Sequence, residues 1–83
     1  MRSQVEIEEW MCAYLGDLLK VPASELDIET NFDRLGLDST SAVALAGDLE
    51  DWLRVEIDPT LPYDFPTIRT LALELSELTR KAA

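Results

Sequence analysis

The chain of 83 residues contains no histidine and one cysteine, and basic residues are scarce in it. Histidine is the commonest general base and metal-ligating side chain. Its absence excludes a Ser-His-Asp triad or a histidine-bearing zinc site built from this chain alone. Cys12 has no partner for an internal disulfide, which is typical of a reducing compartment, and we interpret it as a small buried apolar residue. We therefore expect neither catalytic nor metal-ligating residues.

Acidic residues outnumber basic ones by 17 to 7, which gives a net charge of -10. Nucleic acids and anionic membranes are disfavoured as partners because both are bound through basic residues. Proteins with positively charged surfaces are the natural partners, although acidity that serves solubility alone explains the composition equally well. No apolar run is long enough for a signal peptide or a membrane span, so we expect a cytoplasmic protein, and we expect it to be monomeric.

Apolar side chains recur at helical spacing in three stretches, and nowhere do they alternate as in a strand. Helices are expected over Ser3 to Lys20, over Ser39 to Leu53, and from a cap at Thr67 onward. Ser3 and Glu6 form a capping box at the first start. The stripes expected to face the core are Ile7, Trp10, Met11, Tyr14, Leu15 and Leu18; Ala42, Leu45, Ala46, Leu49, Trp52 and Leu53; and Ile68, Leu71, Leu75 and Leu78.

The segment VPASELDIETNFDRLGLD between the first two helices is long for a connection in a compact domain. Because apolar residues are scattered through it, we expect an ordered loop pinned to the core, with a turn of helix at Ser24–Leu26. Another helical turn, capped by Thr60, is expected at Thr60–Asp64. The prediction is one all-α domain over residues 1–83, a small four-helix bundle of three main helices and a short third helix.

Asp38 and Ser39 stand together where this loop gives way to the second helix, and both are good N-cap residues. A serine hydroxyl at the positive end of a helix is also well placed to carry a phosphate group. As a nucleophile Ser39 would be poor, because nothing in the chain activates it as histidine would. We therefore predict that Ser39 is modified by another protein, while a plain capping role for Ser39 stays open.

The outward face of the second helix combines small residues with an acidic rim. Gly47 in a helix interior costs about 1 kcal/mol relative to alanine. Small groups ringed by acids would let a partner approach closely with its arginines or lysines, whereas the simpler interpretation is a tolerated surface glycine. The predicted docking residues are Thr40, Val43, Ala44, Gly47, Asp48, Glu50 and Asp51.

Polar residues of the first loop alternate as in a calcium-binding EF-hand. Phe32 stands where that motif requires glycine, and Asp38 stands where it requires a closing glutamate. We interpret this alternation as a coincidence of an acidic loop. The residues concerned are Asp27, Glu29, Asn31, Asp33 and Asp38.

The stretches LGLDST, SAVALAGDLEDWL and YDFPTIRTLALEL, in this register, resemble an acyl carrier protein over nearly the whole chain. The resemblance implies a four-helix bundle in which Ser39 carries 4′-phosphopantetheine, with Asp38 flanking it. It further implies that a separate phosphopantetheinyl transferase moves this arm from coenzyme A onto Ser39 Oγ. The thiol of the arm would then hold an acyl thioester for acyl-loading and acyl-accepting enzymes, which would recognise the second helix through basic patches.

Within the resemblance, the Asp38-Ser39 pair is more typical of acyl than of peptidyl carriers. The DFPTI segment and Trp52 resemble carriers of polyketide assembly lines. Thr40 and Gly47 stand where such proteins usually have larger apolar residues, which indicates a specialised set of partners. A peptidyl or aminoacyl carrier, and a helical interaction module without a prosthetic group, are the alternatives. If Trp52 fills the space between the helices, we expect a shallow or absent acyl cavity.

Overall fold

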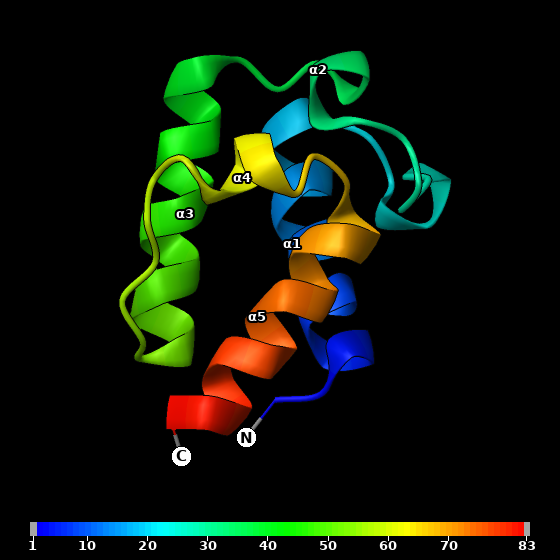
Figure 1. Ribbon diagram of the computed structural model, residues 1–83. Helices are drawn as coiled ribbons and strands as arrows, with labels where there is room; N and C mark the ends of the chain where they lie inside the picture. Colours follow the sequence, from blue (N-terminus) through cyan, green and yellow to red (C-terminus); the bar gives the residue numbers. More distant parts are fainter. Residues whose placement is uncertain (1, 83) are drawn as a thin grey trace.

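The computed structural model describes residues 2–82, so Met1 and Ala83, the ends of the expected domain, lie outside it. Its elements are α1 (Gln4–Leu19), the 3-10 turn η1 (Ala23–Glu25), α2 (Phe32–Leu35), α3 (Ser39–Leu53), α4 (Leu61–Asp64) and α5 (Ile68–Ala82). The described residues form no strand, and α1 packs along α5 while α4 contacts α3 (Figure 1). The predicted all-α bundle is confirmed, η1 lies one residue before the turn expected at Ser24–Leu26, and α2 is an additional helical turn in the first loop.

The first helix begins where the sequence predicts. The backbone N–H of Glu6 donates to Ser3 Oγ, and the backbone N–H of Ser3 donates to Glu6 Oε1, each over 3.1 Å. These bonds form the capping box, and the bond from the Ser3 N–H lowers the pKa of Glu6. At the other end the chain folds back against Gly16, where an added Cβ would lie 2.8 Å from the carbonyl oxygen of Val21. Glycine is therefore required at that close approach.

The core lies between the three long helices and uses most of the predicted stripes. Leu18 is an exception, because 44% of it is exposed. It stands in the last turn of α1, where the helical period continues but the side chain borders a surface groove instead of the core. Trp10, Tyr14 and Trp52 are half-buried at the edge of the core. The fully buried side chains are Ile7, Met11, Leu15, Leu45, Leu49, Ile68, Leu71 and Leu75.

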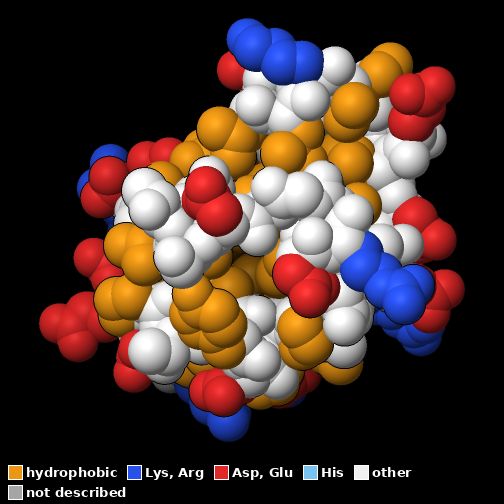
Figure 2. Space-filling view, turned by 90° about the horizontal axis from the view of Figure 1, so that it is seen from above, with side chains coloured by type: hydrophobic (Ala, Val, Ile, Leu, Met, Phe, Trp, Pro, Cys, Tyr) orange, Lys and Arg blue, Asp and Glu red, His pale blue; other side chains and the backbone are white. Residues whose placement is uncertain are grey.

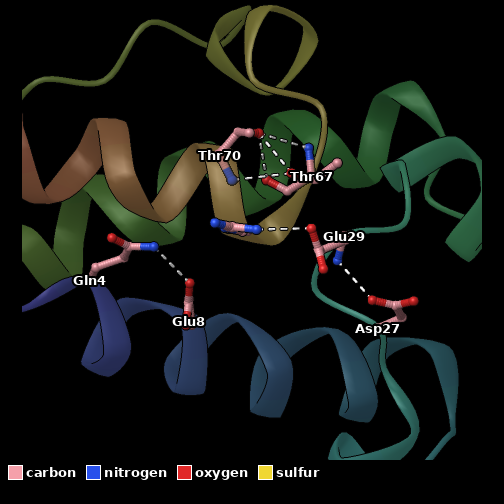
Figure 3. A network of polar contacts seen from close by, with 7 residues as sticks. Gln4, Glu8, Asp27, Glu29, Thr67 and Thr70 are labelled. Carbon is pink, nitrogen blue, oxygen red and sulfur yellow. Dashed lines mark hydrogen bonds and ion pairs between the residues drawn. The ribbon is translucent and has the colours of Figure 1, made fainter.

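The first loop is ordered because it is fastened to the start of α5. The backbone N–H of Arg69 donates to the Ile28 carbonyl over 3.0 Å, and that of Phe32 donates to the Pro66 carbonyl over 2.8 Å. Figure 3 shows Glu29 facing this end of α5, where the Arg69 guanidinium lies 2.9 Å from its carboxylate. That ion pair is exposed and contributes less than about 1 kcal/mol. The backbone bonds and the buried Phe32 therefore hold the loop.

Two details of the short elements differ from the prediction. Helix α2 was not expected, because the distant contact of Phe32 with Pro66 helps to define it, together with the left-handed turn at Gly36 (φ 101°). Thr60 makes no side-chain cap for α4, since its hydroxyl donates to Asp58 instead. The predicted cap at Thr67 is confirmed, because its Oγ1 accepts from the Thr70 N–H over 3.1 Å. Among the helices of residues 2–82, none is both long and apolar enough to cross a bilayer.

Candidate attachment site at the start of α3

Asp38 is the N-cap of α3. Its backbone is extended (φ -89°, ψ 176°), and its Oδ1 accepts a hydrogen bond from the Ser41 N–H over 2.8 Å. This bond from Ser41 holds the pKa of the Asp38 carboxyl below its ordinary value. Asp38 is therefore ionised and committed to the helix end. Spacing alone did not decide which of the two adjacent residues caps the helix, and the geometry assigns the cap to Asp38.

Ser39 is the first residue of α3, and its side chain is exposed. Among the contacts of residues 2–82, none is a hydrogen bond to the Ser39 hydroxyl, because Asp38 already does the capping. The N–H groups of the first turn have no acceptor within the helix, and they give this end a partial positive charge. A phosphate group joined to Ser39 Oγ would lie at the end of a helix that favours anions. The donor set thus fits a phosphate ester.

A hollow of about 270 Å³ adjoins Ser39. Its apolar lining includes Phe32 from α2, Ala42 from α3 and Pro62 from α4, and the exposed ring of Tyr63 stands at its rim. Figure 2 looks onto this end of the molecule, where apolar side chains spread across the middle, with acidic groups among them and both acidic and basic groups at the edge. The place of Tyr63 beside Ser39 was not predicted from the sequence. The only signal was the Pro-Tyr pair within a short helical turn, and α4 meets α3 only through tertiary packing.

Most predicted docking residues lie together on the outward face of α3. Thr40, Val43, Ala44, Gly47 and Asp51 are all exposed, and half of Val43 is open to solvent. A Cβ added to Gly47 would meet nothing within 4 Å. Close packing inside the molecule therefore does not require glycine at this position.

Two predicted docking residues are engaged within the molecule. The Glu50 carboxylate is half-buried, and its Oε1 accepts from the Ile57 N–H over 2.8 Å, which fastens the chain that leaves α3. The Asp48 carboxylate faces Tyr14 of α1. Burial of the phenol, together with this carboxylate, raises the pKa of Tyr14 to about 12. Glu50 thus belongs to the fold more than to the docking face.

Acidic residues of the first loop serve its own backbone. Asp27 Oδ1 accepts from the Glu29 N–H and Asp33 Oδ1 accepts from the Arg34 N–H, each over 2.9 Å. Glu29 pairs with Arg69. Within the described part of the chain, no three histidine, cysteine or acidic residues are grouped as metal ligands.

Comparisons with known proteins show which proteins the chain resembles in sequence. The family model described as "Phosphopantetheine attachment site" matches residues 9–75. The acyl carrier protein TtuC of Teredinibacter turnerae is 36% identical over 52 residues, which are 63% of this chain and 60% of that protein. One subunit of the phenolphthiocerol/phthiocerol polyketide synthase of Mycobacterium tuberculosis is 32% identical over 72 residues, which are 87% of this chain. The match spans only 4% of that much longer synthase polypeptide.

Solved structures of carrier proteins have the same fold. An acyl carrier protein from Anabaena sp. PCC 7120 with a variant phosphopantetheinylation-site sequence superposes with a TM-score of 0.87 and 38% identity, over 93% of this chain and 88% of that one. A free-standing peptidyl carrier protein from Acinetobacter baumannii superposes with a TM-score of 0.83 and 34% identity, over 92% and 96%.

Proposed function

Because the chain belongs to the phosphopantetheine attachment-site family, we propose that it is an acyl carrier whose Ser39 bears the 4′-phosphopantetheine arm. The observation that carries the proposal is that Asp38 and Ser39 have different roles at the start of α3. Asp38 caps the helix, and the neighbouring Ser39 hydroxyl is exposed and makes no hydrogen bond within the described residues. When attached, the arm supplies a thiol that holds acyl groups as thioesters.

The chain's own residues hold Ser39 in place at the start of α3. We propose that another protein supplies the base and carries out the attachment. Asp38 is adjacent to Ser39 in sequence, but its lowered pKa makes it a weak base and its Oδ1 accepts the Ser41 N–H. The chain also has no histidine, the side chain that most often acts as a general base. A phosphopantetheinyl transferase would supply that base and would transfer the arm from coenzyme A. The carrier is therefore proposed to be a substrate and not an enzyme.

We infer that partner enzymes approach along the outward face of α3. Its small residues are exposed, Asp48 and Asp51 border it, and the net charge of -10 attracts basic surfaces. The proposed partners are the transferase and the acyl-loading and acyl-accepting enzymes of polyketide or related natural-product biosynthesis. Their pathway is inferred from the relatives, which include a polyketide synthase.

We propose that the protein works as a monomer in the cytoplasm. Burial raises the pKa of the Cys12 thiol, so this half-buried cysteine stays protonated and unreactive, as suits a reducing compartment. The strong negative charge disfavours self-association.

A peptidyl carrier is the second candidate, because a structurally similar protein is named as one. Both candidates load Ser39 in the same way and differ in what the arm then accepts. Incubation of the loaded protein with acyl-transferring or aminoacyl-transferring enzymes, followed by mass measurement of the thioester, separates them.

The test of the attachment site is the intact mass after incubation with coenzyme A, Mg²⁺ and a broad-specificity phosphopantetheinyl transferase. We expect a gain of one phosphopantetheine in the parent and none in Ser39→Ala. Ser41→Ala is the matched control, since it removes a hydroxyl two residues away in the same turn, and it should load like the parent. Loading of Ser39→Ala at the same stoichiometry would overturn the assignment.

A further inference from the structure

Four side chains from three parts of the sequence form a stack on the flank where α1 meets α3. The Trp10 ring lies between those of Tyr14 and Trp52, at centroid distances of 5.2 Å and 4.9 Å and interplanar angles of 16° and 11°. The Arg2 guanidinium lies 4.9 Å from the centroid of the Trp52 ring. The molecule's own arginine thus occupies one end of this aromatic stack by a cation–π contact.

The other end of the stack borders an open groove. The groove is lined by Trp10, Ala13, Tyr14, Asp17 and Leu18. Leu18 is 44% exposed although it is a large apolar side chain. A second hollow shares Ala13 and Asp17 with the first and extends toward Val21, which is also exposed. Exposed apolar groups therefore continue past the C-terminal end of α1.

The charge around the groove is mostly negative. Asp17 of α1 lines it directly, and Asp48 of α3 faces Tyr14 from the opposite helix. Lys20 lines only the adjoining hollow. The ion pairs within residues 2–82 involve Glu6, Glu29 and Glu77, so Asp17 and Asp48 are not neutralised by a basic residue of the described chain. The groove is thus aromatic, apolar and acidic together.

We propose that this groove is a second docking surface, and that it receives an arginine-bearing segment of a partner protein. Arginine fits better than lysine because its flat guanidinium can stack on an aromatic ring and pair with a carboxylate at the same time. Arg2 makes the first of these contacts at the far end of the same stack. A partner arginine beside Tyr14 would make both, with Asp17 as its carboxylate and Leu18 against its apolar neighbours.

The surface does not include Ser39 and does not rest on its modification. A partner seated there would hold the carrier by α1, through residues that do not line the hollow beside Ser39. The hollow beside Ser39 and the groove share no lining residue. A test of Ser39 loading and a test of peptide binding in the groove can therefore give different results.

The experiment uses a tryptophan-free, end-blocked peptide in which arginine and leucine alternate, titrated into the full chain. Trp10 and Trp52 are the only tryptophans of the chain, and both belong to the stack, so their fluorescence reports occupation. Amide NMR shifts locate the site. We expect a fluorescence change, shifts concentrated on residues 10–21, and weaker binding of the same peptide with lysine in place of arginine.

Two pairs of variants separate the groove from bulk charge. Asp17→Asn and Leu18→Gln are expected to weaken binding about three- to fivefold each. Asp64→Asn removes the same charge from α4, and Leu73→Gln changes a similarly exposed leucine of α5, so both should stay within about twofold of the parent. Equal losses in the control variants, equal binding of the lysine peptide, or no binding at all would each overturn the proposal. Normal phosphopantetheine loading of Leu18→Gln shows that the variant is folded.

Discussion

The carboxylate of Asp38 accepts the Ser41 N–H over 2.8 Å, and so Ser39, which lies between the two residues, is released from capping α3. This contact assigns the cap to Asp38 and so argues against the capping role that the sequence left open for Ser39. If Ser39 were only a cap, its Oγ would accept an N–H of the first turn. Instead the Ser41 N–H donates to Asp38, the residue before Ser39. The alternative of an interaction module explained Ser39 only as a helix cap, so it gives no explanation for this serine when Asp38 is the cap.

The first prediction concerns stability. Asp38→Ala removes the cap and should lower the free energy of unfolding by about 1 kcal/mol. Ser39→Ala removes no described hydrogen bond and should change it by less than about 0.5 kcal/mol. Urea denaturation followed by circular dichroism measures both. Equal losses in the two variants would mean that Ser39 caps the helix in solution.

The second prediction concerns acid. The Ser41 N–H depresses the pKa of Asp38 in the folded state. Its contribution to stability is therefore present above the unfolded-state pKa and is lost as the pH falls through the folded-state pKa. Asp38→Asn keeps an oxygen acceptor but does not titrate. We expect the parent to lose more stability than this variant between about pH 7 and about pH 2.

Urea titrations of both proteins across that range give the comparison. Other carboxylates titrate in both proteins, and their contributions cancel in the difference. A constant difference at every pH would show that Asp38 is not ionised by preference in the folded state.

The bounds of α3 were predictable because local signals agree there. A cap precedes the helix, and the apolar period 42, 45, 46, 49 places one face on the core. Leu18 was wrongly assigned to the core face. Its helical period is correct, but the neighbouring helices do not cover the end of α1. Helix α2 escaped prediction because Phe32 depends on Pro66, a contact between distant parts of the chain.

The place of Ser39 at the start of α3 was predictable, whereas its surroundings were less so. The roles of Tyr63 beside the hollow and of Arg2 on Trp52 depend on how distant segments meet. Periodicity assigned Trp52 to packing, and the rings do pack, but on the edge of the core. Glu50 was grouped with its acidic neighbours because nothing local shows that the chain returns to it at Ile57.

The third prediction separates Glu50 from Asp51. Glu50→Ala leaves the Ile57 N–H without its acceptor and should cost about 1 to 3 kcal/mol of unfolding free energy. Asp51→Ala, on the exposed face, should stay within about 0.5 kcal/mol of the parent. Glu50→Gln, which retains an oxygen acceptor, is the matched control and should recover most of the loss. Similar losses in Glu50→Ala and Asp51→Ala would return Glu50 to the docking face.

The last prediction tests why Gly47 is a glycine. An added Cβ meets nothing within 4 Å, so Gly47→Ala should stabilise the chain by up to about 1 kcal/mol through helix propensity. Gly47 lowers helix stability relative to alanine, although no neighbouring atom requires a glycine there. The close approach of a partner's backbone at this position would explain it. Gly47→Leu should then load with a KM for the transferase raised about tenfold and a kcat unchanged, which is about 1.4 kcal/mol of lost binding. Gly47→Ala, which adds one methyl group, should load almost as the parent does. Normal loading of Gly47→Leu would mean that the transferase does not approach at this position, and the glycine would then need another partner to explain it.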